Sequence, residues 1–404
     1  MGAPSDPTPP DSQARWRILA LLFVCRIGLG LQFQTLGSVS DSLVASLGFS
    51  YAQIGTLIGL FMLPGLVLAM PAGYLGRVLS DRVLVALAFL CLAAGSGIAA
   101  LAQGFGQLAL ARLACGIGFV LSTIYLTKMT TDWFAGGELA TAMGVLVMSW
   151  PLGIALGQIG QVWIDQHFDW RAVFAVAALY CALGAAALFV FYRPPPGRAA
   201  APVETARLPR GELLLTLLAA TCWGLYNASY IVLLSFAPRV LTAGGHGAAK
   251  AAAIISLASW AMIVSGPLGG RIADRTGRPA LLLYVCTAAS VVALLLLRQT
   301  ALAVGLSLVY GLFGGAPAGV LMALTGQAMA PQRRAFGMGV FFSFYFVLVT
   351  LGPPLAGWMF DLSDDPFQPI LFAVVLLVGA AGCYHLFQVL KPRWLKPSAA
   401  PPAR

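Results

Sequence analysis

Arg26 and Arg112 are the residues of this sequence best placed for chemistry, because each stands alone inside a long apolar segment. A charged side chain at the centre of a membrane costs about 2.5 to 3.5 kcal/mol to insert, so we expect a functional or a specific structural contact for each. The 14 Asp and Glu residues fall in expected loops, tails or segment ends. Two arginines without a neighbouring acid favour an anionic ligand, since a guanidinium binds a carboxylate through two parallel hydrogen bonds.

Helical spacing adds polar and aromatic groups beside the two arginines. Arg26 shares a helix face with Phe33 and Gln34, and Arg112 shares one with Phe119 and Thr123. A further segment, residues 223–230, carries an aromatic and amide stripe at i, i+3, i+4 and i+7. We therefore predict a substrate-binding site made of Arg26, Gln34, Arg112, Thr123, Trp223, Tyr226, Asn227 and Tyr230.

Each of these assignments has a structural alternative. Arg112 is equally suited to joining packed helices, and an aromatic stripe is more often a packing surface than a ligand site. If Arg26 binds the anion, its guanidinium needs another partner when the site is empty. We expect this partner to be Gln34, Asn227, water or a carbonyl at the C-terminus of a helix.

The composition places these residues in membrane-spanning helices. Hydrophobic residues are 59% of the chain and charged residues 9%, against about 25% charged in soluble domains. The apolar runs are continuous, which excludes the alternating strands of a membrane barrel. Twelve runs have about the 20 residues that cross the hydrocarbon layer as a helix. They lie at 17–39, 51–75, 82–103, 105–127, 138–161, 171–192, 211–238, 249–269, 279–298, 300–327, 335–360 and 368–390.

The chain is predicted to be an all-α integral membrane protein with 12 transmembrane helices in two six-helix halves. Residues 142–145 and 337–340 read Ala-Met-Gly-Val and Gly-Met-Gly-Val, an internal repeat that makes Trp150 and Tyr345 equivalent. These two aromatics are candidates for gates, although packing is the commoner role. The predicted division is a disordered cytoplasmic tail at 1–14, an N-terminal half at 15–192, a Pro-rich cytoplasmic linker at 193–210, a C-terminal half at 211–392 and a cytoplasmic tail at 393–404.

The positive charges predict the orientation. Of 24 Lys and Arg residues, 18 fall in the tails, the linker and the loops on the side of the tails, whereas four fall on the other side. Positive residues gather on the cytoplasmic side of membrane proteins, so both termini are expected in the cytoplasm. We predict a multi-pass protein of a prokaryotic cytoplasmic (inner) membrane.

The sequence does not contain the residue patterns that are typical of metal binding, phosphate binding or nucleophilic catalysis. All seven cysteines lie in expected spans at no metal-ligand spacing. No phosphate-binding Gly-Lys-Ser/Thr loop and no nucleophile elbow occurs. We therefore predict no catalytic residue, no metal, no cofactor and no enzyme activity. The net charge of +10 lies in loops, which excludes nucleic acid as a partner. The expected partners are a small solute and the lipid bilayer, and we expect a monomer.

A charged stretch between the eighth and ninth predicted spans carries the clearest motif. The residues from Gly266 to Pro279 are expected to form a hairpin turn at the membrane surface, and residues 270–278 read Gly-Arg-Ile-Ala-Asp-Arg-Thr-Gly-Arg. This stretch resembles the cytoplasmic loop signature of the major facilitator superfamily of secondary transporters. Residues 112–118 are similar to a second signature of that family, Arg-x-x-x-Gly-x-Gly. The resemblance implies a conformational loop formed by Asp274, Arg275, Gly277 and Arg278.

The resemblance also implies a function. The family suggests two parallel six-helix halves, a cavity lined by helices 1, 4, 7 and 10, and transport by alternating access. Together with the two arginines, it predicts a secondary active or facilitative transporter of a small anionic solute. Residues 128–134 are similar to the cyanate-transporter-like subgroup. The alternatives are a proton-coupled drug or metabolite exporter, which would carry a carboxylate inside the membrane, and a non-transporting sensor of the same fold.

Overall fold

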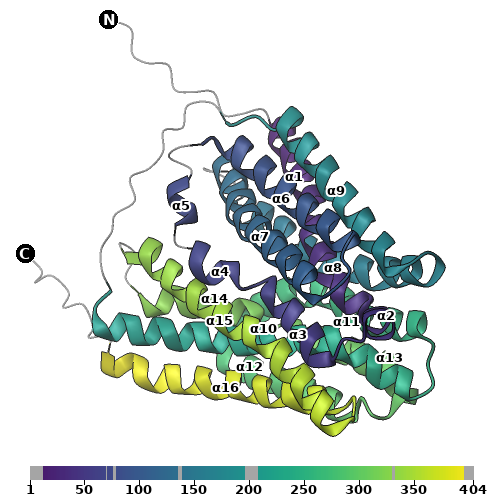
Figure 1. Cartoon of the computed structure of the whole chain (residues 1–404). Coiled ribbons are helices and arrows are strands. Elements are labelled where there is room, and N and C mark those ends of the chain that lie inside the picture. Colours follow the sequence, from purple (N-terminus) through teal and green to yellow (C-terminus); the bar gives the residue numbers. More distant parts are fainter. Residues whose placement is uncertain are drawn as a thin grey trace, which may run out of the picture.

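The computed structural model describes residues 12–69, 71–75, 79–134, 139–195, 208–329 and 333–394. These residues contain helices and no strand. Twelve of the described segments are long and apolar enough to cross a membrane, which confirms the predicted fold class. Figure 1 shows the helices in two groups, one purple through blue to teal from the first half of the chain and one teal through green to yellow from the second half.

Among the described residues, the first group contains nine helices. Helix α6 packs against α7 and α9, and α8 packs against α1. The helices are α1 (Ser12–Ser38), α2 (Ser40–Leu47), α3 (Tyr51–Leu60), α4 (Pro64–Leu68), α5 (Ala72–Leu75), α6 (Asp81–Ala100), α7 (Phe105–Trp133), α8 (Leu139–His167) and α9 (Trp170–Phe191).

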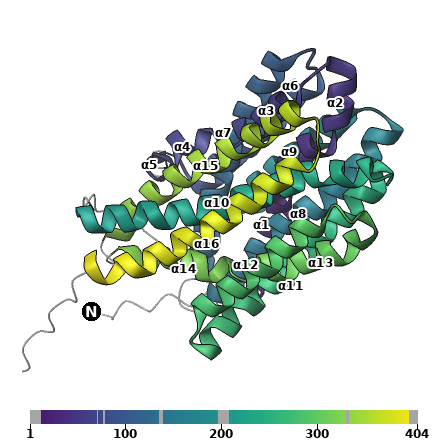
Figure 2. The same cartoon turned by 90° about the horizontal axis from the view of Figure 1, so that it is seen from below.

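The described part of the second group includes seven α-helices and one short 3-10 helix. Figure 2 shows α10 and α16 side by side along this group. The helices are α10 (Arg210–Ala243), α11 (Ala248–Thr276), α12 (Pro279–Leu296), η1 (Thr300–Leu302), α13 (Ala303–Gly315), α14 (Ala318–Ala328), α15 (Arg334–Ser363) and α16 (Gln368–Trp394).

Prolines divide two of the predicted spans. The segment predicted at 51–75 forms α3, α4 and α5, with Pro64 in the first turn of α4. The segment predicted at 300–327 is interrupted before α14, where Pro317 is the N-cap. Proline has no N–H to donate within a helix, so a helix tends to end before it. The short helix α2 was not anticipated, because its eight residues are too few to resemble a span.

The predicted hairpin turn at 266–279 is wrong in its extent. Helix α11 continues through Pro267 to Thr276, and α12 begins at Pro279. Only Gly277 and Arg278 remain between them. Gly277 ends α11 with φ 62° and donates its N–H to the Ala273 carbonyl at 3.0 Å, a left-handed cap that glycine adopts without strain. The apolar pattern ends earlier than the helix, which extends beyond the expected membrane surface.

Glycines bring particular helix pairs into close contact. A Cβ atom on Gly30 of α1 would lie 2.8 Å from the nitrogen of Ile154 in α8. A Cβ atom on Gly55 of α3 would lie 2.6 Å from the carbonyl carbon of Pro353 in α15. Real Cβ atoms do not approach so closely, so only glycine allows these backbones to pack at this distance. The first contact lies within one half and the second joins the two halves.

The two halves are held together at the end of the bundle away from the start of α1 and the end of α16. We call this the distal end, and the other the termini end. At the distal end the Asp361 carboxylate accepts the N–H groups of Tyr51 at 2.9 Å and Ala52 at 2.7 Å. Arg239 forms an ion pair with Asp41 at 2.5 Å. A carboxylate at a helix N-terminus and an ion pair across the halves both stabilise closure of this end.

At the termini end, the described ion pairs stay within one half. Lys128 pairs with Asp81 and Asp132 in the first half, and Arg333 pairs with Glu212 in the second. The halves are therefore joined by charge at one end and separately braced at the other. A solute site that opens to either side in turn would lie between the two halves.

Candidate solute-binding site

A central cavity of about 90 Å³ lies between the two halves. This space can hold several water molecules, since about 10 to 15 Å³ of such volume suffices for one. Helices α1, α7 and α8 contribute from the first half, and α10 and α15 from the second. The lining residues are Arg26, Phe33, Met62, Phe119, Thr123, Trp150, Ile154, Asn227, Tyr230, Ile231 and Tyr345.

Arg26 is the one charged residue of this described lining. Its side chain is buried, and Nη1 donates to the Leu146 carbonyl of α8 at 2.7 Å. Its Nε is buried and has no hydrogen-bond partner among the described residues. The described partner is a carbonyl inside α8, whereas the prediction named a carbonyl at the C-terminus of a helix. A guanidinium has five N–H donors, so this one keeps donors that can bind an anion in the cavity that it lines.

The close approach of α1 to α8 explains why Arg26 can reach Leu146. A Cβ atom on Gly30 would lie 2.5 Å from the carbonyl oxygen of Trp150, so only glycine allows the two helices to pack at this distance. The Leu146 carbonyl also accepts from Ser149 Oγ at 2.6 Å. A glycine, which carries no charge, therefore positions the charged group.

Arg112 does not line the central cavity. Its Nε donates to the Leu57 carbonyl at 3.2 Å, and Nη1 donates to the Gln32 carbonyl at 3.1 Å and to Thr35 Oγ1 at 3.2 Å. The guanidinium also lies 4.3 Å from the centre of the Phe61 ring. These contacts join α7 to α1 and α3, the packing role that the sequence allowed as the alternative.

Three other predicted residues do line the cavity. Thr123 Oγ1 is buried without a hydrogen-bond partner among the described residues. The Asn227 side-chain N–H donates to the Trp223 carbonyl at 2.8 Å. This bond does not use the amide oxygen of Asn227. The Tyr230 hydroxyl lies 2.8 Å from Ser259 Oγ of α11. The cavity therefore offers several hydroxyl and amide groups around the arginine.

The remaining predicted residues lie elsewhere. Gln34 lines a neighbouring pocket toward the distal end. Trp223 stacks on Tyr226 with 5.5 Å between ring centres, and the Tyr226 hydroxyl donates to the Gly314 carbonyl. The predicted stripe of α10 therefore has two roles: Asn227 and Tyr230 line the cavity, whereas Tyr226 packs against α13. The i, i+3, i+4, i+7 spacing does not distinguish these roles, because the four positions cover more than a quarter of the helix circumference.

An aromatic wall lines the first-half side of the cavity. Phe33 and Phe119 lie 5.4 Å and 5.2 Å from Trp150, measured between ring centres. Trp150 and Tyr345, the residues made equivalent by the internal repeat, both face the cavity from opposite halves. The candidate list omitted this pair and the wall, although the repeat contained the signal for the pair. Aromatic faces of this kind can pack against the C–H groups of a solute.

The predicted conformational loop is only partly described. Arg275 and Arg278 are exposed, and Gly277 forms the helix cap. The backbone of Asp274 belongs to α11, but its side chain lies outside the described part of the structure. A role for the Asp274 carboxylate at a neighbouring helix end stays a prediction.

Comparison with known proteins identifies the family. The family model of the Major Facilitator Superfamily matches residues 22–310 and 213–403. The chain belongs to the Major Facilitator Superfamily. Its members of this type are transporters, so the prediction that the chain is not an enzyme is confirmed.

Several curated relatives in this superfamily carry sugar-acid names. The hexuronate transporter of Escherichia coli K12 is 25% identical over 181 residues, which cover 45% of this chain and 42% of that protein, less than half its length. The hexuronate transporter of Bacillus subtilis is 23% identical over an alignment that covers 97% of each chain. The likeness to the cyanate-transporter-like subgroup stays a prediction.

Solved structures of the superfamily share the fold. A bacterial homolog of the human lysosomal transporter Spinster, crystallised in an inward-facing and unoccupied conformation, has a TM-score of 0.75 and 19% identity, with 96% of this chain and all of that one covered. The nucleoside transporter NupG has a TM-score of 0.73 and 15% identity, with 93% and 99% covered. These likenesses confirm two halves of spanning helices in this superfamily member.

Proposed function

We propose that this superfamily member transports small carboxylated solutes, with sugar acids as the first candidates. The observation that carries the proposal is Arg26, a buried arginine that lines a cavity between the halves and has one described hydrogen bond. The described lining of that cavity contains no Asp, Glu or His. The names of the hexuronate and galactonate relatives support an acidic substrate.

In this proposal Arg26 binds the carboxylate through two donors, and neighbouring groups orient the rest of the solute. Thr123, Asn227 and Tyr230 supply hydrogen bonds, and the aromatic wall contacts the apolar faces of the carbon skeleton. Arg112 has an indirect role and does not contact the solute. It holds α7 against α1, the helix that carries Arg26. A guanidinium favours planar carboxylates over spherical anions, since its fork matches two oxygens.

Transport would proceed by alternating access. We place the termini end in the cytoplasm of a prokaryotic cell, at the cytoplasmic membrane. The sequence predicts 18 of the 24 basic residues on that side, and the relatives are bacterial. The distal contacts of Asp361 and Arg239 then close the outer end. Release of these contacts, and closure at the termini end, would expose the cavity to the outside.

The test is counterflow with purified protein in liposomes. We expect a labelled monocarboxylate such as glucuronate, gluconate or galactonate to accumulate against a preloaded anion, and neutral sugars and cations to fail. A neutral or cationic solute carried at least ten times faster than every carboxylate in the panel would overturn the proposal. The same panel separates this function from that of a drug exporter, which would carry hydrophobic cations.

A further inference from the structure

A second polar pocket lies between the halves, about one helical turn closer to the distal end than the central cavity. We call it the outer pocket. On α8, Ile154 lines the central cavity and Gln158 the outer pocket, and on α10 the corresponding residues are Ile231 and Ser235. The polar side chains that matter here are Gln34, Ser38, Gln158, Asp165, Gln166 and Ser235.

Two side chains of α8 leave buried polar atoms without partners in the outer pocket. Gln158 is 1% exposed, and neither its Nε2 nor its Oε1 has a hydrogen-bond partner among the described residues. Asp165 Oδ2 accepts from Ser42 Oγ at 2.6 Å, but Oδ1 is buried without a partner. Buried polar atoms are bonded in the great majority of cases. These atoms therefore point to a ligand that supplies both donors and acceptors.

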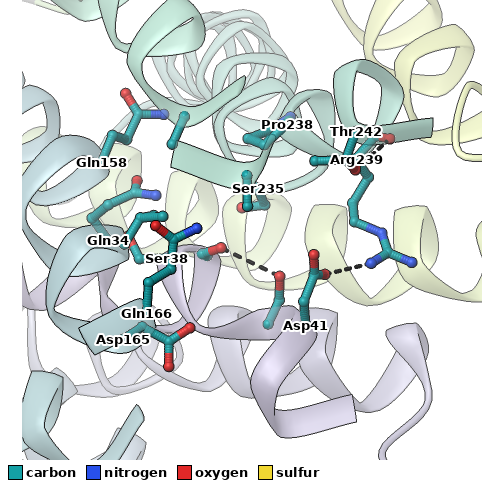
Figure 3. A pocket seen from close by; sticks show the side chains of 15 residues that line it. Gln34, Ser38, Asp41, Gln158, Asp165, Gln166, Ser235, Pro238, Arg239 and Thr242 are labelled. Carbon is teal, nitrogen blue, oxygen red and sulfur yellow. Dashed lines mark hydrogen bonds and ion pairs between the residues drawn. The ribbon is translucent and has the colours of Figure 1, made fainter. Parts of the chain in front are cut away.

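The charge of the outer pocket restricts that ligand. Asp41 and Arg239 pair with each other at the edge of the pocket, as Figure 3 shows, which leaves Asp165 as an additional carboxylate. A second carboxylate would be repelled at this position. Hydroxyl groups fit better, because each donates one hydrogen bond and accepts others, as amides and serines also do. Figure 3 places Gln34, Gln158 and Gln166 on one side and Ser235 and Thr242 on the other.

The outer pocket is a separate site rather than an extension of the Arg26 site. Eight residues of α1 separate Arg26 from Gln34, a rise of about 12 Å at 1.5 Å per residue. The apolar side chains of Phe33, Ile154 and Ile231 line the central cavity at the level between them. A six-carbon acid is too short to occupy both sites fully at once.

We propose that the outer pocket is a second binding site, which holds the hydroxyl groups of a polyhydroxylated monocarboxylate on its path between the distal end and Arg26. The proposal rests on the proposed function and narrows its substrate class to acids rich in hydroxyl groups and with one carboxylate. Asp165 keeps the carboxylate of the solute away from the outer pocket, so the acid group is directed toward Arg26.

The test compares gluconate with hexanoate, which has the same number of carbons and no hydroxyl groups. Purified full-length protein in liposomes gives a KM for each acid, and the hexanoate-to-gluconate KM ratio measures hydroxyl recognition. Gln158→Leu should lower this ratio about tenfold, because the leucine removes both the donor and the acceptor. The matched control is Gln161→Leu on the same helix, whose amide donates to the Leu31 carbonyl at 2.9 Å and does not line the outer pocket.

An unchanged ratio in Gln158→Leu, with a thermal unfolding midpoint equal to that of the parent, would overturn the inference. A parent that carries hexanoate but not gluconate would also overturn it, and would leave the proposed function standing. Failure of the parent to carry any carboxylate would overturn the proposed function itself.

A second variant keeps the inference testable if Gln158→Leu does not fold. Asp165→Asn should admit the dicarboxylate glucarate, with its KM relative to that of gluconate lowered at least threefold, because the repelling charge is gone. No change in the relative KM of glucarate would count against a solute path through the outer pocket.

Discussion

The two buried arginines occupy opposite kinds of environment, although the sequence presents them alike. Arg112 uses its Nε and Nη1 in three hydrogen bonds and rests on an aromatic ring. Arg26 has one described hydrogen bond, to Leu146, and lines the central cavity. Each guanidinium also keeps one buried nitrogen without a described partner, Nε in Arg26 and Nη2 in Arg112. Burial and unbonded donors alone therefore do not identify a ligand-binding charge, and the position of Arg26 at the cavity makes the distinction.

The largest expected effect is that of Arg26→Ala. Loss of the charge and of the forked donor should reduce carboxylate counterflow at least a hundredfold. The thermal unfolding midpoint should change little, because only one described hydrogen bond is lost. Purified variant in liposomes, with its unfolding curve measured in parallel, gives both quantities. Residual transport above a tenth of the parent rate would contradict the role of Arg26.

Arg112→Lys should have the converse effect. A lysine keeps the charge but cannot reproduce the forked contacts to Leu57, Gln32 and Thr35, so the free energy of unfolding should fall by about 2 to 3 kcal/mol. The Kd for the carboxylate should stay within twofold of the parent in the folded fraction. A tenfold weaker Kd at parental stability would instead place Arg112 in contact with solute.

Arg26→Lys sharpens the comparison, because the charge is kept and only the donor geometry changes. We expect the carboxylate to bind about tenfold more weakly, a loss of about 1.4 kcal/mol. Isothermal titration of the detergent-purified variant measures this loss. An unchanged affinity, in a protein that unfolds at the parental temperature, would remove Arg26 from the site.

The smallest effects are expected from the two threonines near the arginines. Thr123→Val removes a hydroxyl that has no described partner, so it should weaken solute binding about threefold and leave stability unchanged. Thr35→Val removes an acceptor of Arg112, so it should lower the free energy of unfolding by about 1 kcal/mol and leave binding unchanged. If both variants lost binding alike, or both lost stability alike, the proposed difference between the two arginines would be wrong.

Much of the molecule could be predicted from local patterns. Long apolar runs indicated 12 spans, because a helix satisfies its own backbone hydrogen bonds in lipid and the length and hydropathy of a span can be read from the sequence. The isolated charges of Arg26 and Arg112 stood out against that background. The internal repeat also related Trp150 to Tyr345, which meet at one cavity.

The tertiary structure decided what the local patterns left open. Helical spacing assigns a side chain to a face but does not say which neighbour covers that face. Close packing at Gly30 turned Arg26 toward Leu146 and the cavity, whereas the packing of α7 against α1 and α3 enclosed Arg112 in carbonyl groups. Polar partners far apart in sequence, such as Asp361 with Tyr51, also depend on how the halves meet. The sequence alone determined which groups are costly to bury, and only the assembled helices determined which of them lines the cavity between the halves.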